Sequence, residues 1–266
     1  MRKLWLPLLV IALQSAAIAN AADLLSPCKL PGVARAAKCG SVEVPENWDQ
    51  PAGRKLSIAV AVIPAEVAGS RNDPLVPLMG GPGEAAIGDA EDYLEPWGPM
   101  LREHDLLLVD QRGTGKSGAL TCPLFDPKNP GASLRDLFPV AQIERCTKEL
   151  SARADLTQYT YAHFARDLEH VRRTLGYGQL NLHAGSYGTR AAQFYLRAYP
   201  QSVRTVYLGS VVPLDVPTPL TMAKTAESVR NQMFDACAAD PACKAAFPSA
   251  PSRSWSRSSC SRSASA

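Results

Sequence analysis

The sequence predicts an α/β protein built around a mostly parallel sheet. Short apolar runs typical of strands alternate with segments of helical periodicity. The clearest helix is 162–175, where apolar residues recur at i, i+4, i+7 and i+11. It is followed by a strand at 179–184, a helix at 189–200 and a strand at 204–212. Strands that alternate with helices form a mostly parallel sheet covered on both faces.

The remaining segments extend this pattern at both ends. Residues 39–66 resemble two paired strands joined by a Pro-Ala-Gly turn. Further along the chain we expect a short buried strand that ends in glycines at 74–84, a strand from 105, a loop-rich stretch at 119–141, a helix at 142–153 and two or three helices in 219–246.

Residues 1–21 have the features of an export signal. A basic start at Arg2 and Lys3 precedes an apolar run, and Ala19-Asn20-Ala21 supplies small residues before a cleavage point. The alternative is a membrane anchor, but the apolar run breaks at Gln14 and no stop-transfer charges follow. We therefore expect a secreted protein, periplasmic or extracellular, with no stable membrane anchor.

Cysteine usage agrees with export. Six cysteines precede the C-terminal tail, and Cys260 within the tail is a seventh. In an exported protein an even set indicates disulfides, although six cysteines allow fifteen pairings. Proximity in sequence favours Cys28–Cys39, Cys122–Cys146 and Cys237–Cys243. None has the C-x-x-C spacing of zinc or redox motifs, so no metal is expected from the cysteines.

The chain divides by composition into a body and a tail. We expect a core at 22–218, the start of a helical cap at 219–248, and a disordered tail at 249–266 that is rich in serine and arginine. The tail is either natural or translated out of frame, and the unpaired Cys260 favours the second interpretation. The net charge of +3 includes two positive charges in the signal and three in the tail. The body is therefore slightly acidic, which argues against nucleic-acid binding.

The glycine-rich turn at 113–118 matches the G-x-G-x-x-G dinucleotide pattern. A dinucleotide site needs a helix that opens at the third glycine, but Pro123 interrupts the segment that follows. A phosphate-binding loop needs glycine five residues before Gly115, where Asp110 stands. We therefore expect no nucleotide, and no other cofactor is indicated.

The segment "LNLHAGSYGTRAAQFYL" carries the strongest functional signal. A strand enters a turn of small residues with Ser186 at its apex, and a helix leaves the turn. This is the pattern of a nucleophile elbow, with Ala184 in place of the first glycine. The alternative is an ordinary turn in which the serine caps the helix. The flanking strand and helix favour Ser186 as a nucleophile.

The segment "MGGPGE" supplies candidates for an oxyanion hole. Acyl transfer develops negative charge on a carbonyl oxygen, and backbone N–H groups stabilise that charge. Gly81 and Tyr187 stand where an α/β hydrolase places these two donors. The alternative for Gly81 is a plain Gly-Pro turn.

Three ordered motifs resemble the proline iminopeptidase and tripeptidyl aminopeptidase group of α/β hydrolases. They are Gly80–Gly83, Asp110–Ser117 and Gly185–Thr189. The resemblance extends to "CGSVEVPENW" and "CAADPACKAAFP". It implies an α/β-hydrolase fold, removal of N-terminal residues from peptides through a serine acyl-enzyme, and a structural role for Asp110–Ser117. Met79 departs from the histidine often found in the group, and Glu84 from a further glycine.

The expected general base is missing. In this fold the acid and histidine follow the serine in the chain, but all four histidines precede Ser186. His183 lies on the same strand as the serine, so we expect it to be a packing residue. His163, Asp167 and His170 share a helical face, which fits either a metal cluster or a solvated face, and Asp215 could imitate a catalytic acid.

We therefore expect the last strands, the acid, the histidine and most of the cap to be absent. The strand around 206–211 then becomes an edge and a template for aggregation. The predicted function is a serine hydrolase of the aminopeptidase type, inactive as this chain. Its substrate is a peptide or a small acyl or aminoacyl compound. Two alternatives remain open: a non-catalytic secreted protein that binds peptides or a partner, and an esterase. The oligomeric state is also open.

Overall fold

The computed structural model describes residues 24–67, 71–124, 128, 131 and 139–248. The predicted signal at 1–21, the tail at 249–266 and Cys260 lie outside these residues. The chain divides into two compact units after Val211. The first holds the sheet and Ser186, and the second holds two helices.

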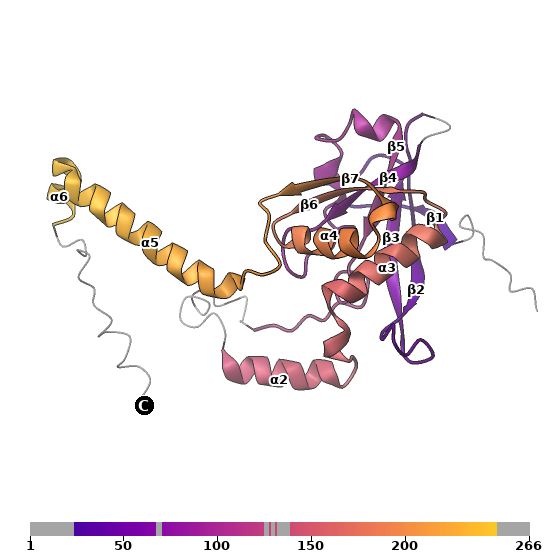
Figure 1. Ribbon diagram of the computed structural model, residues 1–266, viewed down its shortest axis with the longest axis horizontal. Helices are drawn as coiled ribbons and strands as arrows, with labels where there is room; N and C mark the ends of the chain where they lie inside the picture. Colours follow the sequence, from indigo (N-terminus) through magenta and orange to yellow (C-terminus); the bar gives the residue numbers. More distant parts are fainter. Residues whose placement is uncertain (1–23, 68–70, 125–127, 129–130, 132–138, 249–266) are drawn as a thin grey trace, which may run out of the picture. The chain divides into compact units, whose positions relative to one another are not determined.

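A mixed sheet of seven strands is the centre of the first unit, in the order β1-β2-β3-β5-β4-β6-β7 (Figure 1). Strands β5, β4, β6 and β7 are parallel, whereas β1, β2 and β3 add antiparallel neighbours. The strands are β1 (Leu25–Cys28), β2 (Ala37–Pro45), β3 (Lys55–Ile63), β4 (Arg71–Leu78), β5 (His104–Val109), β6 (Leu180–Gly185) and β7 (Val203–Gly209). The predicted α/β fold with a mostly parallel sheet is confirmed.

Helices α3 (Tyr161–Thr174) and α4 (Tyr187–Ala198) lie side by side over one face of the sheet (Figure 1). Phe164, Leu168 and Val171 of α3 are buried there, as their spacing predicts. Tyr195 of α4 is fully buried in the same cluster. This face holds the larger hydrophobic core and fixes the start of α4 beside the sheet.

The opposite face of the sheet is covered by the segment between β4 and β5. That segment contains the short 3₁₀ helices η1 (Ala90–Tyr93) and η2 (Met100–Arg102). It buries Ile87, Trp97 and Leu101 against the strands. On this face a loop with two 3₁₀ helices thus covers the strands.

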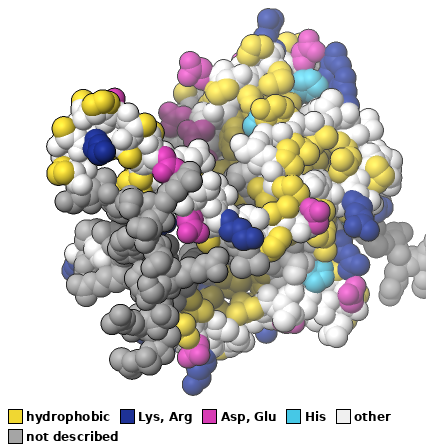
Figure 2. All heavy atoms as spheres, turned by 60° about the vertical axis from the view of Figure 1, so that its left-hand side comes forward, with side chains coloured by type: hydrophobic (Ala, Val, Ile, Leu, Met, Phe, Trp, Pro, Cys, Tyr) yellow, Lys and Arg dark blue, Asp and Glu magenta, His cyan; other side chains and the backbone are white. Residues whose placement is uncertain are grey.

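Strand β7 lies at one end of the described sheet, so the prediction of an edge there is confirmed. Tyr207 on this strand is 60% exposed, and Val211 just beyond it is 50% exposed. Figure 2 shows that hydrophobic side chains remain on the surface between charged ones. An unpaired strand with exposed apolar residues can pair with another chain.

The three expected disulfides are present: Cys28–Cys39, Cys122–Cys146 and Cys237–Cys243. The first joins β1 to β2, and the second ties the loop-rich stretch to helix α2 (Val140–Ser151). The third lies within the second unit and joins α5 (Thr218–Ala239) to α6 (Pro241–Ala246). Among the helices of the described residues, none is long and apolar enough to cross a bilayer.

Candidate active site

Ser186 occupies a strained turn between β6 and α4. Its backbone angles are φ 43° and ψ −117°, a left-handed conformation that residues other than glycine rarely adopt. The Ser186 N–H donates to the Gly209 carbonyl at 3.0 Å, which ties the turn to β7. The Ser186 carbonyl accepts from the Thr189 N–H at 3.0 Å and the Thr189 hydroxyl at 2.6 Å. Bonds on both sides of the serine therefore hold the turn that its sequence predicts.

Gly188 allows the first turn of α4 to pass directly over the end of β4. A Cβ atom built on Gly188 would overlap the carbonyl groups of Leu78 and Met79. A Cβ atom built on Gly185 meets nothing within 4 Å. The small residue at position 188 is therefore required by packing, whereas the one at 185 is not.

We expect Gly188→Ala to lower the free energy of unfolding by about 1–3 kcal/mol, the usual cost of overpacking. The added methyl group must displace backbone rather than a flexible side chain. Urea denaturation would measure this change, and Gly185→Ala is the matched control. Equal effects of the two substitutions would contradict the packing argument.

The glycine loop after β4 lies against the serine turn. A Cβ atom built on Gly80 would lie 3.5 Å from the Gly185 carbonyl oxygen and 3.9 Å from Ser186 Cβ. The Tyr187 N–H donates to the Gly80 carbonyl at 3.1 Å, and the Gly81 N–H donates to Glu84 Oε2 at 2.7 Å. The structure thus brings Gly80 beside Ser186, while both predicted oxyanion donors bond to acceptors of the protein itself.

The loop Asp110–Ser117 is hydrogen-bonded to the loop after β4 and to β3. Asp110 accepts from the N–H groups of Ile87 and Lys116, each at 2.9 Å. The Ser117 hydroxyl donates to the Asp110 carbonyl at 2.8 Å and accepts from the Ala59 N–H at 2.9 Å. These bonds connect the loop after β4 to β3 and β5. They support the structural role that the resemblance implies.

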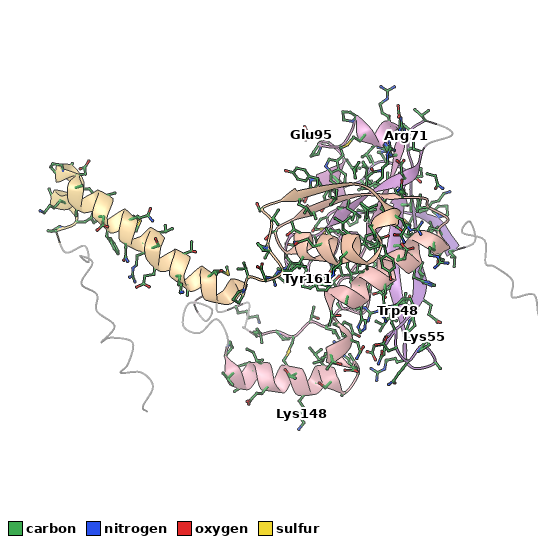
Figure 3. The ribbon with its side chains drawn as sticks, viewed as in Figure 1. Trp48, Lys55, Arg71, Glu95, Lys148 and Tyr161 are labelled. Atoms are coloured by element: carbon green, nitrogen blue, oxygen red, sulfur yellow. A yellow bond between two sulfur atoms is a disulfide. The ribbon has the colours of Figure 1, made fainter. Side chains whose placement is uncertain are left out.

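Tyr161 contacts the residue that follows the serine. It begins α3 (Figure 3), and its ring lies 5.0 Å from the ring of Tyr187 and 5.5 Å from that of Phe194. Burial raises the pKa of Tyr161, and the neighbouring Tyr187 hydroxyl raises it further. No sequence pattern singles out Tyr161, because its ring contacts residues of another helix and belongs to no local motif.

The four histidines have their contacts away from the serine turn. The Nδ1 atoms of His104 and His163 each lie 2.8 Å from a carbonyl oxygen, of Asp73 and Gln158 respectively. His170 packs edge-on against Trp48. His183 lies between the rings of Trp97 and Tyr207, each centroid 4.8 Å away, as expected for a packing residue. Within the described chain we find no histidine hydrogen-bonded to Ser186.

The rings of Trp97, His183 and Tyr207 line a cavity of about 410 Å³ beside strands β6 and β7. Burial lowers the pKa of His183 from its usual value of 6.5. The folded state therefore favours neutral His183, whereas the unfolded chain binds a proton below about pH 6.5. Stability from this residue is present above that pH and is lost as the pH falls through the folded pKa.

We expect His183→Phe to weaken the loss of stability between about pH 7 and pH 5. Phenylalanine preserves an aromatic ring but does not titrate. Denaturation midpoints measured across this range would test the prediction. Tyr207→Phe is the control, since it retains the histidine and the stack. An unchanged pH slope in His183→Phe would exclude this residue as a source of the slope.

Neither interpretation of the 163–170 helical face holds for Asp167. Its side chain is fully buried and not solvated, whereas His163 and His170 are half-buried. Its carboxylate accepts from Arg112 Nε and Nη2, both at 2.6 Å, and from the Trp48 indole at 2.9 Å. In the part of the chain that the structure describes, no group of three His, Cys, Asp or Glu residues could hold a metal ion. Asp215 lies in the second unit.

A strained serine turn on a largely parallel sheet, beside a glycine loop, defines the α/β-hydrolase class of proteins. The sequence matches the family described as "alpha/beta hydrolase fold" over residues 73–253. The chain belongs to this family.

Curated relatives include proteins named for peptide and ester chemistry. Serine protease Hip1 of Mycobacterium tuberculosis is 30% identical, over 81% of this chain and 44% of that protein. Carboxylesterase B of M. tuberculosis is 32% identical, over 79% and 43%. Tripeptidyl aminopeptidase of Streptomyces lividans is 28% identical, over 66% and 35%. The chain spans less than half the length of these relatives.

Proposed function

We propose that the protein is an exported serine hydrolase that removes N-terminal residues from peptides through an acyl-enzyme on Ser186. The observation that carries the proposal is the strained turn at Ser186, with φ 43°, beside the Gly80–Gly81 loop. Strain of this kind is retained where it positions a reactive group. The relatives named serine protease and tripeptidyl aminopeptidase support a peptide substrate. The three disulfides support export.

In the proposed reaction the Ser186 hydroxyl attacks the peptide carbonyl carbon. The negative charge that develops on the carbonyl oxygen is stabilised by the N–H groups of Gly81 and Tyr187. The C–N bond then breaks, the amine leaves with a proton, and water hydrolyses the acyl-enzyme. A general base must take the serine proton. Because every histidine contacts other groups, we propose that this chain by itself is inactive or nearly so.

A second candidate is an esterase, which the relative named carboxylesterase B supports. The two functions differ in whether the site binds a free amino terminus. Peptides present an ammonium group near the scissile bond, whereas simple esters do not.

Phosphonate probes would test both the nucleophile and the substrate class. We would incubate the chain with a tripeptidyl phosphonate, its N-acetylated form and a short alkyl phosphonate, and locate the adduct by peptide mass spectrometry. The proposed function predicts an adduct on Ser186 that forms fastest with the free amino terminus, and no adduct in Ser186→Ala. Equal rates for all three probes would favour the esterase. An adduct elsewhere would exclude Ser186 as the nucleophile.

A further inference from the structure

A single peptide unit carries both hydrogen bonds that occupy the proposed oxyanion donors. This unit joins Gly80 to Gly81. Its carbonyl accepts from the Tyr187 N–H at 3.1 Å, and its N–H donates to Glu84 Oε2 at 2.7 Å. The carbonyl and N–H of a trans peptide point in opposite directions. The Gly81 N–H therefore points away from Tyr187 in this structure.

Rotation of this peptide plane would change both bonds together. A turn of roughly 180° alters only ψ of residue 80 and φ of residue 81, and glycine accepts the values that other residues cannot. The rotation removes the carbonyl from the Tyr187 N–H and directs the Gly81 N–H to the same side. Two N–H donors then face one point beside Ser186, as an oxyanion hole requires.

The geometry points to Glu84 as a positioning residue that holds the Gly80–Gly81 peptide in the closed orientation. We propose that the oxyanion hole forms when the Glu84 carboxylate releases the Gly81 N–H and this peptide rotates. The proposal rests on the proposed function, because it assigns the hole to the acyl-transfer site of Ser186. It also gives a role to the departure from glycine at position 84.

Two properties of Glu84 suit a hydrogen bond to the Gly81 N–H that can both form and break. A carboxylate is a strong acceptor for a backbone N–H, so it favours the closed state. Glu84 is exposed, however, and water can replace the contact at small cost. A carboxylate next to a developing oxyanion would also oppose it, so the contact must break before the reaction. Asp89 is close enough that Glu84 contributes to its raised pKa, after the larger effect of burial.

Amide hydrogen exchange by NMR would test this coupling without any activity. Glu84→Gly removes the acceptor of the Gly81 N–H. It does not change the donor or the acceptor of the bond from the Tyr187 N–H to the Gly80 carbonyl. If one peptide carries both bonds, exchange should rise roughly tenfold at Gly81 and at Tyr187, the size expected for a lost charged hydrogen bond. Glu84→Gln retains an acceptor oxygen and should restore much of the protection. The Ile87 N–H, which donates to Asp110, is an internal control that should not change.

Faster exchange at Gly81 alone would overturn the proposal, since Glu84 would then act only on its own partner. Labelling of Ser186 by a fluorophosphonate gives the second readout. We expect Glu84→Gly to be labelled about tenfold faster than the wild type, and Glu95→Gln, which removes a negative charge elsewhere, to match the wild type. Equal rates in Glu84→Gly and the wild type would also overturn it. If neither is labelled at all, Ser186 is unreactive in this chain, and hydrogen exchange alone decides the role of Glu84.

Discussion

Replacement of Asp167 by alanine is expected to lower the free energy of unfolding by about 3–5 kcal/mol. Asp167 is fully buried, and Arg112 is 4% exposed. Two bonds of 2.6 Å join them, and Arg112 also donates to the carbonyls of Glu46 at 2.7 Å and Gln158 at 2.9 Å. Removal of the carboxylate leaves a buried guanidinium without its counter-charge. A typical domain has only about 5–15 kcal/mol of stability in total, so this loss is severe.

The ion pair with Arg112 also explains why a carboxylic acid can occupy the fully buried position 167. Burial raises the pKa of the Asp167 carboxyl, and the Arg112 guanidinium opposes that rise by favouring the ionised form. Through this pair Arg112 connects the loop after β5 to helix α3. We therefore expect the substitution to loosen both elements.

The control is an exposed ion pair on the same helix, which joins α3 to the turn between β2 and β3. Asp49 accepts from Arg166 of α3 at 2.8 Å, and the two side chains are 76% and 43% exposed. Asp49→Ala should change the free energy of unfolding far less than Asp167→Ala, because solvent screens such exposed pairs. Urea denaturation of both variants gives the comparison. A double variant, Asp167→Leu with Arg112→Met, should recover part of the loss, since no charge is then buried alone. Equal costs for Asp167→Ala and Asp49→Ala would refute this account.

Much of the fold follows from local patterns along the chain. The apolar periodicity of 162–175 predicts α3 within one residue at each end, and the small residues around Ser186 predict the turn between β6 and α4. The sheet order does not follow from such patterns. Strand β3 pairs with β5 rather than with β4, its neighbour in sequence. That choice depends on tertiary packing, which a local pattern does not encode.

The error at Asp167 has an identifiable cause. The residue types of His163, Asp167 and His170 suggest metal binding and hide the burial of Asp167. The same numbers place it three residues after Phe164 and four before Val171, both of which are buried. A helix places such residues on one face, so the spacing already indicated a buried carboxylate. Its partner Arg112 lies 55 residues away and could not be identified without the fold.

The candidate site was also only partly predictable. The positions of Gly81 and Tyr187 follow from the motifs, but the direction of each N–H does not. Whether a backbone N–H faces the serine or Glu84 depends on the orientation of one peptide plane between two glycines. Glycine permits both orientations, so sequence alone carries no preference.

Ser186 is expected to react very slowly with probes of serine nucleophiles. We expect a fluorophosphonate to label this chain on the order of a million times more slowly than it labels the tripeptidyl aminopeptidase of S. lividans, because each of the four histidines contacts groups other than Ser186. In subtilisin, loss of the histidine costs about this much in kcat. A serine hydroxyl is a weak nucleophile until a base takes its proton.

Residual labelling is still expected, because an oxyanion hole and binding alone retain about 10³–10⁴-fold catalysis over water in such enzymes. Labelling that is slow and lost in Ser186→Ala would therefore fit a turn that positions the serine without a base. Fast labelling would contradict the expectation and require another base. The four single substitutions at His104, His163, His170 and His183 would then show whether a histidine moves to the serine. If all four retain fast labelling, the proton must pass to a carboxylate or to water, and the catalytic arrangement differs from that of the family.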